Sequence, residues 1–178
     1  MNYTIIFLFV IAGISSCKAQ STTTAKNESI SQIENTTKAK TNKFPEASGF
    51  VSDFEGVFTQ EQAQKLERKL DEYQLRTGRI IVVVTVENIA PYNDIKNFAV
   101  DLSNEWGIGD RDKNDGLSIV LSTTLREVRI STGLGTEKIL TDEICQNIIN
   151  TIMLPEFKNG NYYEGINRGL NALADQWK

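Results

Sequence analysis

The stretch Ile80-Ile-Val-Val-Val-Thr-Val86 carries the strongest structural signal in this chain. Its side chains are all β-branched, which favours extended backbone over helix. The run also lacks the alternation of apolar and charged residues that marks a strand with one wet face, so both of its faces are expected to be buried. The stretch therefore predicts a central strand in a sheet that helices cover on both sides.

Helices are predicted before and after this strand. Thr59 and Gln62 have the spacing of a capping box, apolar residues follow at helical intervals, and Thr77-Gly78 ends the run. After the strand, a second helix starts near residue 93 or 94 and buries one face as far as Trp106. A helix, a strand and a helix in close succession are typical of an α/β domain.

The second half of the chain predicts two more strands and two more helices. Residues 117–122 form another continuous apolar run and residues 127–132 alternate, so the two indicate a hairpin. Thr141 caps a helix to about Met153, Pro155 is expected to end it, and a last helix covers roughly 162–177. With a right-handed crossover between the first two strands, this order predicts a small three-layer α/β/α sandwich with a mixed central sheet.

The N-terminal residues have the features of an export signal. Residues 5–14 are uncharged and almost wholly apolar, but a helix of about ten residues spans only about 15 Å, half of a bilayer core. Ile14-Ser-Ser-Cys17 follows, and it resembles the lipobox of bacterial lipoproteins, whose cysteine becomes the acylated N-terminus. We therefore predict a signal peptide at 1–16 and lipidation of Cys17. The alternative is an ordinary secretory signal in which Cys17 has no role.

The residues after Cys17 have the composition of a disordered tether, predicted here as 17–43. Ser, Thr, Asn, Gln, Lys and Ala dominate, and Ile30 and Ile33 are the only large aliphatic residues. Such a segment buries too little apolar surface to offset its ordering entropy. A flexible coil of about 27 residues spans roughly 30 Å. We expect a domain at 44–178, anchored by lipid on the exported side of a membrane, in the cell envelope or periplasm.

Composition excludes several classes of chemistry. The chain has no histidine, which removes Ser-His-Asp and Cys-His mechanisms and His-rich zinc sites. There is no Walker-type loop, and a net charge of −4 without a basic stripe argues against nucleic-acid binding. We expect no haem, nucleotide or zinc cofactor. Cys145 lies in an apolar helical stripe, where a buried small side chain is favoured over a reactive thiolate.

A polar loop before the second apolar strand is the main cluster of acidic groups. It holds Asp110, Asp112, Asn114 and Asp115, and alternating oxygen side chains suit a hard cation such as Ca²⁺. The loop is not an EF-hand, because Asp115 stands where Gly is needed and Leu121 where a bidentate Glu belongs. Two interpretations stay open at this point, a solvated turn and a metal site.

Short motifs in order along residues 50–175 together resemble the TPM domain family, named after thylakoid-lumen, photosystem-associated and nematode membrane proteins. The motifs are Val51-Ser-Asp-Phe-Glu-Gly-Val-Phe-Thr59, Trp106-Gly-Ile-Gly109, Asn114-Asp-Gly116, Arg126, Gly133-Leu-Gly-Thr-Glu137, Thr141-Asp142 and Leu154-Pro-Glu-Phe-Lys-Asn-Gly-Asn-Tyr-Tyr-Glu-Gly165. The resemblance implies an α/β/α sandwich that is often tethered outside a membrane. It also implies one of three roles, namely acid phosphatase activity, maintenance of membrane complexes or divalent-cation binding.

Carried onto this sequence, the resemblance implies one pocket. Asp53, Asp115 and Asp142, with Asn114 adjoining, would hold Ca²⁺ or another divalent cation, and Arg126 would fix a phosphate or carboxylate. Simpler roles are also open for these residues. Asp53 would then brace a turn, Asp142 would complement a helix dipole, and Arg126 would be a hairpin-turn charge.

Departures from the family pattern favour binding over catalysis. Leu125 stands where the family usually has Asp, Leu134 where an aromatic residue is common, and Asn114-Asp115 reverses the usual order of acid and amide. The sequence thus predicts a membrane-tethered envelope lipoprotein that binds or maintains a membrane protein complex. The alternative is an acid phosphatase of low specificity that uses a carboxylate and metal site, with no catalytic residue assigned.

Overall fold

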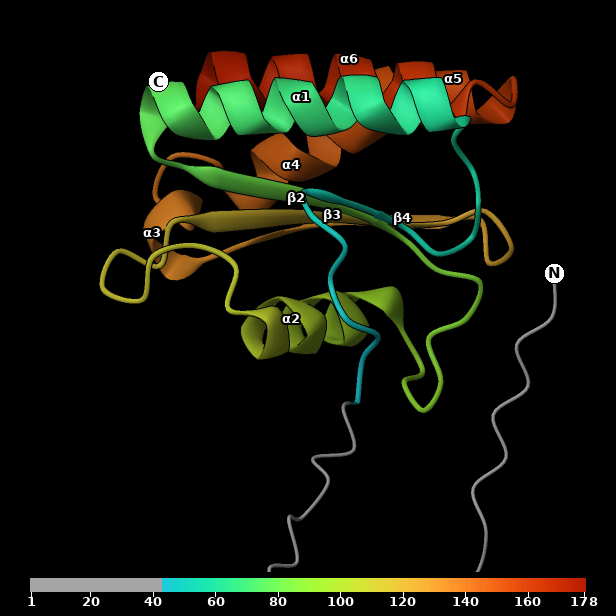
Figure 1. Cartoon of the computed structure of the whole chain (residues 1–178), viewed down its shortest axis with the longest axis horizontal. Helices are drawn as coiled ribbons and strands as arrows, with labels where there is room; N and C mark the ends of the chain where they lie inside the picture. Colours follow the sequence, from blue (N-terminus) through green and yellow to red (C-terminus); the bar gives the residue numbers. More distant parts are fainter. Residues whose placement is uncertain (1–42) are drawn as a thin grey trace, which may run out of the picture. The chain divides into compact units, whose positions relative to one another are not determined.

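The computed structural model describes residues 43–178 (Figure 1). The predicted signal peptide, Cys17 and nearly all of the predicted tether lie outside the described residues. Within the described part, no helix has the length and apolar character needed to cross a membrane.

A four-stranded mixed sheet forms the middle layer (Figure 1). Its strands are β1 (Val51–Asp53), β2 (Ile80–Thr85), β3 (Gly116–Ser122) and β4 (Glu127–Thr132). They lie in the order β1-β2-β3-β4, with the first three parallel and β4 antiparallel to β3. The mixed sheet is as predicted, except that β1 was not foreseen. Three residues are too short for a periodic pattern, and only their pairing with Val83, Val84 and Thr85 makes them a strand.

Helices cover both faces of the sheet and complete the α/β/α sandwich, which confirms the predicted fold class (Figure 1). They are α1 (Gln60–Thr77), α2 (Ile95–Trp106), α3 (Leu134–Glu137), α4 (Asp142–Ile148), the π-helical η1 (Ile149–Met153), α5 (Leu154–Lys158) and α6 (Tyr162–Gln176). The longer helices α1 and α6 and the α4 segment lie on one face, and α2 lies on the other. Several helices therefore cover one face of the sheet, and a single helix, α2, covers the other.

Two separate apolar cores correspond to the two faces. Alternate strand residues such as Val83 and Ile119 pack under α1, α4 and α6, whereas Val84 and Val120 pack against α2. This division follows from the strand geometry, because successive side chains point to opposite faces. The described residues of the two cores lie between positions 44 and 177.

The predicted caps of the first helix and the predicted start of the second helix are confirmed. Thr59 and Gln62 form a reciprocal capping box, and Gly78 ends α1 in the left-handed conformation at a φ of 72°. Asp94 is the N-cap of α2, and its carboxylate accepts a hydrogen bond from the backbone N–H of Asn97. These local contacts are set by neighbouring residues in the chain, which is why sequence patterns locate them.

The prediction that Pro155 ends the third predicted helix, which begins after Thr141, is wrong. Helical backbone continues from α4 through η1 into α5, where Pro155 occupies the first turn. Proline lacks an N–H and its ring clashes with the carbonyl four residues earlier in an α-helix. The wider π turn relieves this conflict, because the N–H of Leu154 bonds to the carbonyl of Ile149, five residues back.

Candidate functional site

Asp53 lies at the end of β1, at the edge where the parallel strands have their carboxyl ends. Its Oδ1 accepts a hydrogen bond from the N–H of Val57 at 2.9 Å, and its Oδ2 accepts one from Phe58 at 2.8 Å. The Thr85 hydroxyl at the end of β2 also donates to it. Asp53 therefore braces the loop between β1 and α1, as the simpler of its two predicted roles required.

Glu55, two residues further on, was not singled out from the sequence. It accepts four hydrogen bonds from the β3–β4 turn, from the N–H and hydroxyl of Thr123 and from those of Thr124, at 2.7–2.9 Å. Partial burial alone would raise the pKa of the Glu55 carboxyl, but these hydrogen bonds outweigh it and hold that pKa below its usual value. The sequence feature that could have identified Glu55 is its position inside the Val51–Thr59 motif.

Arg126 lies in the turn that Glu55 holds, and it lines a pocket at this edge. Its backbone has a φ of 58°. The pocket has a volume of about 540 Å³, large enough for a small organic ligand. Its lining comprises Leu121, Ser122, Thr123, Arg126, Glu127, Val128, Leu154, Phe157, Lys158, Gly160 and Tyr162. The lining thus contains two cationic side chains, Arg126 and Lys158, one carboxylate, Glu127, and an apolar wall. The pocket lies at the carboxyl edge of the sheet, where α/β proteins commonly bind ligands.

The acidic loop lies at the opposite edge, before β3. Asp110 Oδ1 accepts hydrogen bonds from the N–H groups of Asp112 at 2.9 Å and Lys113 at 3.0 Å. The hydrogen bonds from Lys113 and then Asp112 lower the pKa of the Asp110 carboxyl. Asp115 Oδ1 accepts a hydrogen bond from the Asp110 N–H at 3.0 Å. These carboxylates accept hydrogen bonds from the backbone of their own loop, which is typical of a solvated turn.

The glycines of the family motifs bring this loop against the segment that follows β4. A Cβ on Gly133 would lie 2.2 Å from the Asn114 carbonyl oxygen, and one on Gly135 would lie 2.0 Å from the Lys113 carbonyl oxygen. Gly133 and Gly135 have no positive φ, so they are needed for close approach and not for unusual backbone angles. Asn114 itself adopts the left-handed conformation, at a φ of 50°.

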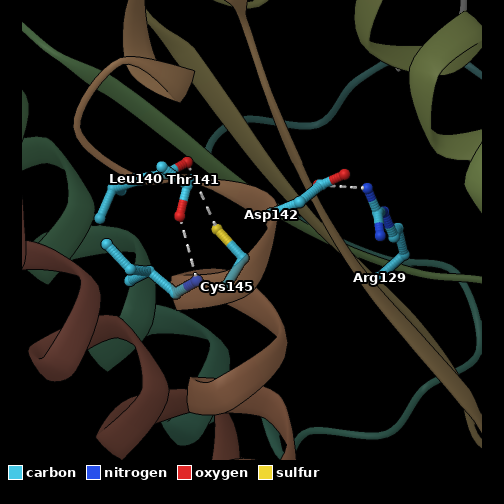
Figure 2. A network of polar contacts seen from close by, with 6 residues as sticks. Arg129, Leu140, Thr141, Asp142 and Cys145 are labelled. Atoms are coloured by element: carbon cyan, nitrogen blue, oxygen red, sulfur yellow. Dashed lines mark hydrogen bonds and ion pairs between the residues drawn. The ribbon is translucent and has the colours of Figure 1, made fainter.

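Asp142 lies at a third place, beside β4 (Figure 2). Its Oδ1 forms an ion pair with Nη2 of Arg129 at 2.7 Å. In the same helix turn, Thr141 is the N-cap of α4, and Cys145 donates a weak hydrogen bond from its thiol to the Leu140 carbonyl. Burial, reinforced by the charge of Asp142, raises the pKa of the Cys145 thiol to about 11, which makes it unreactive at neutral pH.

The structure therefore does not bring the five residues of the predicted pocket together. Asp53 and Arg126 lie at one edge of the sheet, and Asn114 and Asp115 lie at the other. The intervening seven-residue strand β3 is roughly 20 Å long. Across residues 43–178, no cluster of three or more acidic or cysteine side chains is placed to hold a metal ion. Cation binding by fewer of these residues remains a prediction.

The fold and these sites define a small α/β/α sandwich domain with a cationic pocket at the carboxyl edge of its sheet. The model of the TPM domain family matches residues 51–176, and the chain belongs to that family. No curated protein among those compared matches the chain.

Several solved structures share the fold. The N-terminal domain of a protein from P. gingivalis, solved by NMR, is 31% identical with a TM-score of 0.65, over 71% of this chain and 80% of that one. An N-terminal domain from Corynebacterium glutamicum is 13% identical with a TM-score of 0.57, over 76% and 85% of the two chains. A protein from Bizionia argentinensis is 20% identical with a TM-score of 0.57, over 70% and 88%. The last two similarities show the fold alone.

Proposed function

We propose that this TPM-domain chain is a lipid-anchored protein of the cell envelope that binds an anionic group of a membrane-complex partner in the Arg126 pocket. The observation that carries the proposal is that Arg126 and Lys158 both line one pocket of about 540 Å³. Arginine offers a planar set of donors that matches carboxylate and phosphate oxygens, and lysine adds a mobile point charge.

The surroundings of Arg126 support recognition of a ligand with both an anionic and an apolar part. Leu154 and Phe157 supply an apolar wall, and the Tyr162 ring lies beside Phe157, with centroids 5.5 Å apart. Four hydrogen bonds from Thr123 and Thr124 to Glu55 anchor the turn before Arg126. A turn held in this way presents the guanidinium at a defined place, which lowers the entropic cost of binding.

The lipid anchor in the proposal rests on the sequence. Acylation of Cys17 and a tether of about 27 residues would keep the pocket within roughly 30 Å of a membrane surface. A partner at that surface would meet the pocket at a high effective concentration. Binding of Ca²⁺ or another divalent cation also rests on the family resemblance, with the loop that contains Asn114 and Asp115 as its proposed place.

Acid phosphatase activity is the second candidate, because the same two cations would hold a phosphate ester. Hydrolysis also needs a group that activates water. Asp53 and Glu55 already accept hydrogen bonds from the protein, which leaves Glu127 as the carboxylate of the pocket. A lining with two cationic side chains and a single carboxylate favours binding of an anion over its hydrolysis.

The test is an NMR titration of residues 43–178 with inorganic phosphate and, separately, with acetate. Shifts are expected around Arg126 and Lys158, and Arg126→Gln is expected to weaken binding at least about tenfold, because a charged hydrogen bond is lost. Arg111→Gln, in the acidic loop at the other edge, is the matched control and should bind as the wild type does. Equal binding by Arg126→Gln would remove the proposal.

The enzyme alternative is separated by a second measurement on the same proteins. Hydrolysis of p-nitrophenyl phosphate is followed with and without Ca²⁺ in the wild type, in Arg126→Gln and in Asp115→Ala. We expect no turnover above background. Turnover that Arg126→Gln abolishes would replace the binding role with catalysis in this pocket, whereas turnover lost only in Asp115→Ala would place the chemistry at the acidic loop.

A further inference from the structure

The three charged side chains that line the Arg126 pocket are accessible to a ligand. Arg126 and Glu127 of the β3–β4 hairpin and Lys158 of α5 are all exposed. Within residues 43–178, none of the three forms an ion pair or a side-chain hydrogen bond. A ligand that enters the pocket therefore meets two cations and one carboxylate that are all free to pair with it.

Neighbouring charges on the same elements are paired within the protein instead. Arg129 of β4 forms an ion pair with Asp142 at 2.7 Å. Glu156 of α5 forms one with Arg168 of α6. The Glu55 carboxylate accepts four hydrogen bonds from the turn between β3 and β4. The strand, the helix and the turn thus keep their other charges occupied and leave unpaired charges on the lining of the pocket.

The signs of the three unpaired charges indicate what kind of ligand fits. A simple anion pairs with Arg126 and Lys158, but the like charge of Glu127 opposes its binding. A ligand with a positive group beside its anion pairs with all three side chains. A primary ammonium also donates hydrogen bonds, which a carboxylate accepts. Glu127 directly follows Arg126, and consecutive Cα atoms are about 3.8 Å apart, so the two charges of the ligand need to be only a few bonds apart.

We propose that the ligand of this pocket is a zwitterion, in which a phosphate group binds Arg126 and Lys158 and a primary ammonium group binds Glu127. This inference rests on the proposed function, because it keeps anion recognition by Arg126 and adds recognition of the ammonium. Phosphoethanolamine has this chemistry, as a free ester or as the headgroup of a membrane lipid. A pocket of about 540 Å³ with Leu154 and Phe157 in its wall suits an organic ligand of this kind better than a bare ion.

The experiment compares O-phosphoethanolamine with ethyl phosphate, which has the same two-carbon chain but no ammonium. Each ester is titrated into the full chain, purified in a non-ionic detergent, and binding is followed by NMR at about pH 8, where both phosphates are fully ionised. We expect O-phosphoethanolamine to bind about threefold to fivefold more tightly, as one ion pair in a partly exposed site provides. Equal affinity for the two esters would overturn the proposal.

Glu127→Gln separates recognition of the ammonium from recognition of the anion. The variant lacks the partner of the ammonium and also lacks a charge that repels phosphate. It should therefore bind O-phosphoethanolamine more weakly but ethyl phosphate about twofold more tightly, so that the ratio of the two affinities falls to about one. Glu143→Gln, at an exposed position of α4 outside this pocket, is the matched control and should keep the wild-type ratio. A wild-type ratio in Glu127→Gln would also overturn the proposal.

Failure of this inference is distinguishable from failure of the proposed function. If ethyl phosphate binds and Arg126→Gln weakens it, but the ammonium adds no affinity, only the zwitterion is excluded. If neither ester binds, the anion site itself is refuted and the zwitterion with it. Glycerophosphoethanolamine, which has the phosphodiester of a lipid headgroup, identifies the source. Tighter binding of this diester than of O-phosphoethanolamine supports a lipid headgroup as the zwitterion, and weaker binding supports a free phosphate ester.

Discussion

Gly116→Ala tests whether close approach of two loops is what requires glycine at the start of β3. A Cβ at this position would lie 2.1 Å from the carbonyl oxygen of Ile108 and 2.5 Å from its carbonyl carbon. Both contacts are with backbone, so no side chain can rotate away. Residue 116 is also paired with Ile80 in β2, which limits how far the strand can move.

The expected cost comes from two sources. Forcing extra volume into a close-packed site typically costs about 1–3 kcal/mol. Movement of residue 116 would also weaken the hydrogen bonds that its carbonyl accepts from the Gly133 N–H at 2.9 Å and the Thr136 hydroxyl at 3.2 Å. Each contributes about 1 kcal/mol. We expect Gly116→Ala to lower the free energy of unfolding by about 2–4 kcal/mol, a large share of the stability of a small domain.

The assay is urea unfolding of residues 43–178 followed by circular dichroism. Gly78→Ala is the control, because Gly78 has a φ of 72° and a methyl group added there would meet no atom within 4 Å. That variant should lose only about 1–2 kcal/mol, from the left-handed backbone alone. A loss below about 0.5 kcal/mol in Gly116→Ala, or one smaller than in Gly78→Ala, would refute the reasoning.

Two further predictions concern single side chains. Glu55→Gln should destabilise the domain by about 1–3 kcal/mol at pH 7, because four hydrogen bonds lose their charged acceptor. The folded-state pKa of Glu55 is lowered, so its contribution is complete above the ordinary carboxyl pKa of 4.5 and is lost as the pH falls further. Urea unfolding of both proteins should therefore give a smaller difference at pH 3 than at pH 7, and an equal difference would contradict this account. Cys17→Ser should abolish labelling of the full chain by an alkyne fatty acid in bacteria, while Cys145→Ser should label normally; a labelled Cys17→Ser chain would exclude the lipid anchor at that residue.

Local features of the fold were predictable because they depend on neighbouring residues. The capping box at Thr59, the left-handed end of α1 at Gly78 and the buried run in β2 all have causes within a few positions of the chain. The sequence analysis missed β1 because the contacts that make it a strand come from residues far away in the sequence. Glu67 on α1 accepts hydrogen bonds from the N–H groups of Phe50 and Val51 at 2.9 and 2.7 Å, and β2 supplies the other pairings.

The π turn before Pro155 was missed for a related reason. Proline predicts a helix end unless the backbone can widen. Here, the α6 surface contains Gly165 and Gly169, whose missing side chains leave room for Met153 of η1 and Phe157 of α5. Close packing of α6 against η1 and α5 supports the continuous α4–η1–α5 segment. This packing depends on the tertiary fold, so the residues next to Pro155 in the sequence do not indicate it.

The amino-acid sequence alone was sufficient to predict the family, the three-layer architecture and the polar residues that belong to the motifs. These features could be predicted because hydrophobic periodicity and short motifs are local properties of the chain. Only the tertiary structure decided which of those polar residues meet. Asp115 comes directly before β3 and Arg126 lies in the turn after it, so the length of β3 places Asp115 at one edge of the sheet and Arg126 at the other. The same pairing sets Ser131 opposite Ser118, whose hydroxyl contacts Ser103 of α2, and no sequence motif predicts this because it depends on the register between the strands.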